Sequence, residues 1–170
     1  AAAPAVKAVP LEVIGVTGDW VVDIGANDGT LLEMMPSDLH RVAFEPAENI
    51  LPIGQPFDVI RDYFSLESFR TLSRTEKAKL IFSAAMFYAV PNPQEFVRDV
   101  AAILHPEGAW VIEMGDLQAM VENTAFDFIG HEHVAIWSLT VLEPLLYKHG
   151  LGVWRVERVP TNGGSIRLYV

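Results

Sequence analysis

Short apolar runs bounded by turn residues alternate with amphipathic stretches along most of this chain. Short runs rich in β-branched residues predict strands, whereas apolar residues spaced three or four apart predict helices that face a core. The strands are expected at residues 21–23, 41–45, 56–60, 79–83, 109–113, 153–159 and 165–170. Helices are expected to open at Leu31 and to cover residues 65–77, 92–107, 116–123 and 138–149.

The best-marked helix begins at Asn92. Asn92 is a capping residue, Pro93 fits the first helical turn, and Glu95 occupies the capping-box position. Apolar residues at helical spacing follow on one face, and Gly108 is expected to mark the end of this helix. These signals predict a helix that begins after Asn92 and ends before Gly108.

The alternation of strand and helix predicts an α/β domain with an open, mostly parallel sheet that helices cover on both faces. The last two strands flank residues 160–164, whose sequence PTNGG is typical of a hairpin turn. We therefore expect the final pair of strands to be antiparallel and to close one edge of the sheet.

Residues 21–30, VVDIGANDGT, predict a strand, a glycine turn and the start of a helix, which is a common nucleotide-binding arrangement. Glycine lets the backbone approach a ligand closely. A dinucleotide fingerprint would need glycine where this chain has Asn27 and Thr30, and a P-loop would need a lysine after Gly29. The turn therefore favours a ligand without a phosphate group at this position.

Two later strand ends carry acidic residues that suit a nucleoside. Glu45 follows Asp23 by 22 positions, near the offset at which a carboxylate binds ribose hydroxyls, although a solvated strand-end glutamate is the alternative. Asp62 and Tyr63 end the third strand beside Phe64, where an acidic residue and a ring suit adenine. Packing of Phe64 in the core is an equal alternative.

Composition limits the classes of function. The 170 residues, 51% of them hydrophobic, fit one domain over residues 18–170, preceded by a tail or truncated helix at 1–17. A net charge of -10 argues against nucleic-acid binding. The sequence has no apolar run long enough for a membrane span and no signal peptide, so we expect a soluble, cytoplasmic domain without membrane contact.

The segment Gly130-His131-Glu132-His133 carries the candidate acid–base chemistry. Two histidines two residues apart share a face if the chain is extended, and histidine suits proton transfer near neutral pH. The alternative is structural: one histidine packs near the following helix and the other is solvated. A metal site is the weaker interpretation, because only Glu132 and Asp127 are near in sequence as further ligands.

The glycine turn, Glu45 and the terminal hairpin resemble the class I S-adenosylmethionine-dependent methyltransferases over nearly the whole chain from Asp19 onward. The resemblance implies a Rossmann-like, seven-stranded, mostly parallel sheet with an antiparallel last strand and helices on both faces. It implies S-adenosyl-L-methionine as cofactor and S-adenosyl-L-homocysteine as product. We expect no metal site, because the histidine segment has too few further ligands near it in sequence. The resemblance places Asp23 near the methionine part, Glu45 at the ribose and Asp62 with Tyr63 near adenine. The complete expected cofactor site is Asp23, Gly25, Ala26, Asn27, Gly29, Glu45, Pro46, Asp62, Tyr63, Ser83, Ala84 and Met86.

Residues 126–138, with LEPLLYKHGL and NGGSIRLYV downstream, resemble the sugar C-methyltransferases that act on nucleotide-activated ketosugars. By this resemblance His133 is the general base, Glu132 its supporting carboxylate and His131 the first histidine, while Gly130 stands where that family has tyrosine. The expected acceptor is a small molecule such as a nucleotide-sugar. The alternatives are an O- or N-methyltransferase and a non-catalytic domain that retains the fold. We also expect the sequence to be a fragment of a longer chain.

Overall fold

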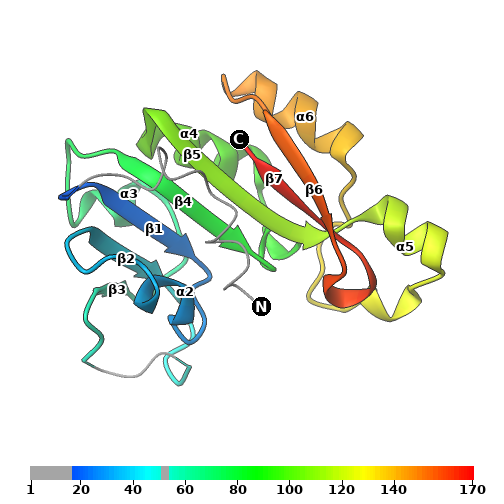
Figure 1. The fold of residues 1–170 in the computed structure, drawn as a ribbon, viewed down its shortest axis with the longest axis horizontal. Coiled ribbons are helices and arrows are strands. Elements are labelled where there is room, and N and C mark those ends of the chain that lie inside the picture. Colours follow the sequence, from blue (N-terminus) through cyan, green and yellow to red (C-terminus); the bar gives the residue numbers. More distant parts are fainter. Residues whose placement is uncertain (1–16, 51–53) are drawn as a thin grey trace.

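The computed structural model describes residues 17–50 and 54–170 (Figure 1). The tail expected at residues 1–17 lies outside this part, apart from Thr17. A seven-stranded sheet organises the described chain, with the strand order β3-β2-β1-β4-β5-β7-β6. Across the described residues, no helix has the length and apolar character that crossing a membrane requires.

The first five strands pair in parallel, and β7 is antiparallel to both of its neighbours, β5 and β6. This topology confirms the expected Rossmann-like sheet with an antiparallel last strand. It also brings the carboxyl ends of β1, β2 and β4 to one edge, where ligands bind in open α/β sheets. The strands are β1 Trp20–Ile24, β2 His40–Phe44, β3 Asp58–Ile60, β4 Ala78–Ala84, β5 Leu104–Gly115, β6 Arg155–Val159 and β7 Ser165–Tyr169.

Helices cover both faces of the sheet, as expected. One core contains the buried side chains of α3, α4 and α6, and the other contains those of α2. The helices are α2 Thr30–Glu33, α3 Leu66–Arg70, α4 Pro93–Ile103, α5 Leu117–Asn123 and α6 Leu139–Lys148. Three 3-10 turns accompany them: η1 Phe87–Ala89, η2 Phe126–Phe128 and η3 Thr161–Gly163.

The start of α4 confirms the capping prediction. The side-chain oxygen of Asn92 accepts a hydrogen bond from the backbone N–H of Glu95 at 3.3 Å, and Pro93 is the first helical residue. The predicted end is wrong. The helix stops at Ile103, and Leu104 is already extended, with φ −67° and ψ 133°. Gly108 instead lies within β5, where an added Cβ would be 2.8 Å from the carbonyl oxygen of Lys79.

The helix expected over residues 65–77 is also shorter than predicted, since α3 covers only Leu66–Arg70. Ser65 begins it with a capping box that involves Ser68. Beyond its end, the hydroxyl of Ser73 accepts the backbone N–H of Glu76 at 3.2 Å. Serine and threonine side chains that bond nearby backbone groups compete with helical hydrogen bonds, which explains why the polar stretch leaves the helix.

The turn between β6 and β7 generates a stability prediction at Gly164. Gly164 has φ +133°, and an added Cβ would lie 2.6 Å from the Cβ of Ala119 in α5. We expect Gly164→Ala to lower the free energy of unfolding by roughly 1–3 kcal/mol, because the variant is strained and overpacked. Urea unfolding measures this loss. Gly152→Ala is the matched control, since an added Cβ there meets nothing within 4 Å. Equal midpoints for the two variants would contradict the packing argument.

Candidate cofactor cavity and active site

A cavity of about 1050 Å³ opens at the carboxyl edge of the parallel strands. The glycine turn, the end of β2, the segment after β3 and the segment after β4 each contribute part of its wall. The structure therefore brings together most of the cofactor residues expected from the sequence: Asp23, Gly25, Ala26, Asn27, Glu45, Pro46, Asp62, Tyr63, Ala84 and Met86.

Two expected cofactor residues do not line this cavity. Ser83 is completely buried, and its hydroxyl accepts a hydrogen bond from the indole N–H of Trp110 at 3.0 Å. Gly29 is buried at the start of α2, with φ +78°. Both residues thus support the wall from behind: Ser83 fixes a core tryptophan, and Gly29 permits the turn into the helix.

The glycine turn approaches Met86 closely. Gly25 has φ +75°, and an added Cβ would lie 3.1 Å from the Cγ of Met86. The backbone N–H groups of Gly25 and Ala26 both donate to the carbonyl oxygen of Phe44, at 2.8 and 3.1 Å. The end of β2 therefore holds the turn in place, and glycine at position 25 leaves room for the segment after β4.

Glu45 fixes the same turn through its side chain. Its two carboxylate oxygens accept the backbone N–H groups of Asn27 and Ala47, each at 2.9 Å. The side chain is buried, yet it lines the cavity. Because each carboxylate oxygen has two lone pairs, the carboxylate keeps acceptor capacity for a ligand after these two bonds.

Asp23 is the most perturbed acid in the cavity. Burial, followed by the negative charges of Glu45 and Asp28, raises the pKa of the Asp23 carboxyl from 3.8 to about 7. A cation beside Asp23 would favour the ionised form and would lower this pKa again. The chemistry of this end of the cavity therefore matches a positively charged group.

The segment after β3 contributes Asp62, Tyr63 and Phe64 to the cavity lining. Asp62 and Tyr63 are exposed, and the carboxylate of Asp62 accepts the backbone N–H of Tyr63 at 2.7 Å. Phe64 lines the cavity and also packs edge-on against Phe44 and Phe96, with ring centroids 5.1 and 5.4 Å apart. The core-packing interpretation of Phe64 is therefore confirmed, and the adenine contact stays a prediction for a ring that also borders the cavity.

Sequence analysis missed the contribution of α4 to the cavity. Phe96 and Asp99 of this helix line the wall, as do the capping residues Asn92 and Glu95. Their spacing and capping signals explained them fully as structural residues. Only the position of the α4 N-terminus beside the carboxyl end of β4 identifies their second role, and sequence order does not reveal that position.

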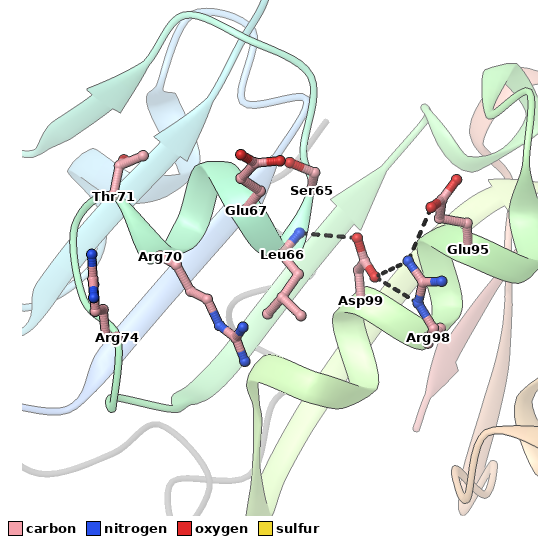
Figure 2. Close-up of a pocket in the computed structure, with 9 residues that line it drawn as sticks. All are labelled: Ser65, Leu66, Glu67, Arg70, Thr71, Arg74, Glu95, Arg98 and Asp99. Carbon is pink, nitrogen blue, oxygen red and sulfur yellow. Dashed lines mark hydrogen bonds and ion pairs between the residues drawn. The ribbon is translucent and has the colours of Figure 1, made fainter.

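A second cavity of about 780 Å³ lies between α3 and α4 (Figure 2). The guanidinium of Arg98 donates to Asp99 at 2.8 and 3.0 Å and to Glu95 at 3.0 Å, and the backbone N–H of Leu66 donates to Asp99 at 3.0 Å. Asp99 is buried and borders both cavities. This network joins the two helices and fixes one wall of the larger cavity.

The histidine segment lies in the connection between η2 and α6. The His133 ring packs between Tyr88 and Phe128, with ring centroids 4.0 and 4.6 Å apart, respectively. His131 is exposed, and its Nδ1 lies 3.2 Å from the carboxylate of Glu132. None of the three residues from His131 to His133 is among the described residues that line the large cavity. The segment instead reaches the cavity wall through Tyr88 of η1.

The surroundings of His133 are partly closed to solvent. Its Nδ1 is buried and has no hydrogen-bond partner within residues 17–50 and 54–170. Burial raises the pKa of the Tyr88 hydroxyl, and the charge of Glu132 raises it further. The backbone N–H of Ala135 donates to the carbonyl oxygen of Tyr88 at 3.1 Å, which ties the segment to η1.

Solved structures define the class of fold. A chain in the complex between the Haloferax volcanii Trm112 methyltransferase activator and the putative methyltransferase has a TM-score of 0.74 and 14% identity, covering 99% of this chain and 88% of that chain. CalO1, a methyltransferase in calicheamicin biosynthesis solved in an SAH-bound form, has a TM-score of 0.65 and 16% identity, covering 92% of this chain and 50% of that chain. The fold is that of methyltransferases.

Sequence comparison identifies the family. A methyltransferase domain family model matches residues 9–156. The C-methyltransferase NovU of Streptomyces niveus is 33% identical over 164 residues, which cover 94% of this chain and 39% of NovU. The chain belongs to the methyltransferase domain family, and it spans well under half of the length of this relative.

The buried Asp23 generates a pH prediction. Between pH 3.8 and about 7 the folded protein holds a proton on Asp23 that the unfolded chain has lost, so stability falls as pH rises through this window. The accumulated penalty above pH 7 is roughly 4 kcal/mol. As the pH rises through this window, we therefore expect the free energy of unfolding of the cofactor-free wild type to fall by more than that of Asp23→Asn.

Urea unfolding at about pH 5 and about pH 8 measures this difference. Asp58→Asn is the matched control, because Asp58 is exposed on β3, outside the cavity lining. Between these two pH values the wild type and Asp58→Asn should lose the same free energy of unfolding, while Asp23→Asn should lose less. A difference between the wild type and Asp23→Asn that stays constant with pH would contradict the assignment.

Proposed function

We propose that this domain is an S-adenosyl-L-methionine-dependent methyltransferase that methylates a carbon beside the carbonyl of a small molecule, such as a nucleotide-activated ketosugar. The observation that carries the proposal is the cavity in which Asp23 and Glu45 face a glycine turn suited to a cationic nucleoside. The 33% identity to the C-methyltransferase NovU supports transfer to carbon.

The residues of the cavity fit this cofactor. A sulfonium and an ammonium group carry positive charge, which suits the acidic end formed by Asp23, and Glu45 keeps acceptor capacity for ribose hydroxyls. Asp62, Tyr63 and Phe64 provide a polar edge and aromatic surface for adenine. When bound, the cofactor supplies an electrophilic methyl group and leaves as S-adenosyl-L-homocysteine.

The chain itself must supply a base. Methylation beside a carbonyl requires removal of a proton from that carbon, and histidine is suited to this role near neutral pH. His133 is the candidate, because it packs on η1, the turn that follows the cavity-lining residue Met86. Glu132 and His131 form an exposed pair beside it, with 3.2 Å between Oε2 and Nδ1. In this assignment Glu132 is the carboxylate that supports the base, and His131 is the first histidine of the segment.

Calorimetry with S-adenosyl-L-homocysteine tests the cofactor. We expect the wild type to bind and Glu45→Ala to bind at least about tenfold more weakly, since it loses a ribose acceptor and frees the Asn27 N–H. Glu45→Gln separates the loss of the acceptor oxygens from the loss of the charge, because glutamine retains one oxygen acceptor without the charge. Glu143→Gln, on the exposed side of α6, is the control. The cofactor assignment fails if the folded wild type does not bind.

Turnover by His133→Asn tests the base. In the whole protein we expect a loss of methyl transfer of at least about 10²-fold with unchanged affinity for S-adenosyl-L-homocysteine, because only proton removal is affected. His149→Asn is the matched control, since His149 bonds Gln94 on α4 at 3.2 Å. Loss of turnover and affinity together would instead assign His133 a structural role.

Mass spectrometry of the product locates the transferred methyl group. A methyl group retained on the carbon skeleton after chemical cleavage supports transfer to carbon, whereas its release would assign transfer to oxygen or nitrogen. Cofactor binding by the whole protein without methyl transfer to any ketosugar tested would favour a non-catalytic domain that retains the fold.

A further inference from the structure

We propose that Tyr88 is a positioning residue that holds His133 against the wall of the cofactor cavity. This inference rests on the proposed function, because it concerns the base of that reaction. The observation that supports the inference is that the short turn η1 has two contacts. Met86 and Ala89 line the cavity, and the Tyr88 ring between them contacts His133.

Two aromatic rings and the imidazole of His133 form a compact cluster. The centroids of Tyr88 and Phe128 lie 4.0 and 4.6 Å from that of His133, and they lie 5.5 Å from each other in an edge-on arrangement. Edge-on and tilted contacts at these separations are favourable geometries for aromatic side chains. The imidazole is therefore held on two sides, and Tyr88 is the nearer of its two aromatic neighbours.

The end of β5 provides space for this cluster. An added Cβ at Gly115 would lie 2.2 Å from the Cζ of Phe128, so the ring occupies the volume that any other residue would fill. The backbone N–H of His133 donates to the carbonyl oxygen of Gly130 at 3.1 Å, and that of Ala135 donates to Tyr88 at 3.1 Å. The backbone and the rings thus fix the histidine segment to the carboxyl ends of β4 and β5.

Tyr88 connects this cluster to the cofactor cavity. Met86 and Ala89 line the cavity, and Tyr88 lies between them in sequence, with its ring directed to His133. Any displacement of the Tyr88 ring changes the position of His133 relative to that wall. Since misplacing a reacting group by about 1 Å can cost a factor of about 10², Tyr88 affects the rate without touching the reacting atoms.

Kinetics of the whole protein test the inference with two substitutions. We expect Tyr88→Leu to lower kcat at least about tenfold while KM for the cofactor stays within about twofold, because the ring is lost but the cavity wall remains. Tyr88→Phe should restore most of the lost kcat, since it keeps the ring and removes only the hydroxyl. Tyr147→Leu, an exposed position on α6, is the matched control.

A spectroscopic readout separates this inference from the proposed function. In protein with ¹³C-labelled histidine, the neighbouring tilted rings shift the imidazole proton resonances of His133, which His133→Asn identifies by their disappearance. We expect Tyr88→Leu to move these resonances and Tyr88→Phe to preserve them. If they move but neither wild type nor variant transfers a methyl group, the ring contact holds and the proposed function fails.

Two other outcomes would overturn the inference. Unchanged resonances and unchanged kcat in Tyr88→Leu would show that the ring does not position His133. An equal fall in kcat, cofactor affinity and unfolding free energy for both Tyr88→Leu and Tyr88→Phe would assign Tyr88 a general structural role.

Discussion

The carboxylate of Glu45 holds together the two chain segments on which the cofactor cavity depends. It lies just beyond β2 and accepts the N–H of Asn27 from the glycine turn and that of Ala47 from its own strand end. Charge-assisted bonds to backbone N–H groups are stronger than neutral ones, and the Glu45 side chain that accepts them is buried. The group that shapes the turn is thus also the group proposed to bind a ribose, so in this proposal ligand binding and local folding share one side chain.

This arrangement has an electrostatic cost. Glu45 and Asp28 both raise the pKa of Asp23, and burial raises it most. Three carboxyl groups at one turn repel one another, and the repulsion is relieved when a cation occupies the cavity. The cavity is therefore less favourable when empty, and a positively charged ligand recovers part of that free energy on binding. A neutral ligand of the same shape would gain no such relief.

Local signals predicted local features well. The Asn92 cap, the buried face of α6 and the spacing between Asp23 and Glu45 each depend on residues close in sequence or on a common supersecondary unit. The failures arose where tertiary contacts decide. Gly108 is needed for the close approach of β5 to Lys79, although its sequence context resembles a helix end. The burial of Ser83 beneath Trp110 and the contribution of α4 to the cavity likewise depend on packing between distant segments.

The connection between η2 and α6, which contains the histidine segment, differs from the rest of the described chain because it holds buried side-chain nitrogens without hydrogen-bond partners. The buried side-chain nitrogens that lack partners in residues 17–50 and 54–170, His133 Nδ1 and Trp137 Nε1, both lie between η2 and α6. Each such atom costs about 1–3 kcal/mol, and native proteins retain few of them. Ile129 and Val134 in this stretch, and Phe126 of η2 just before it, are also exposed. The sheet carries two buried hydrophobic cores that can support a segment whose own contacts are incomplete, and that segment is the one for which the sequence predicts proton transfer.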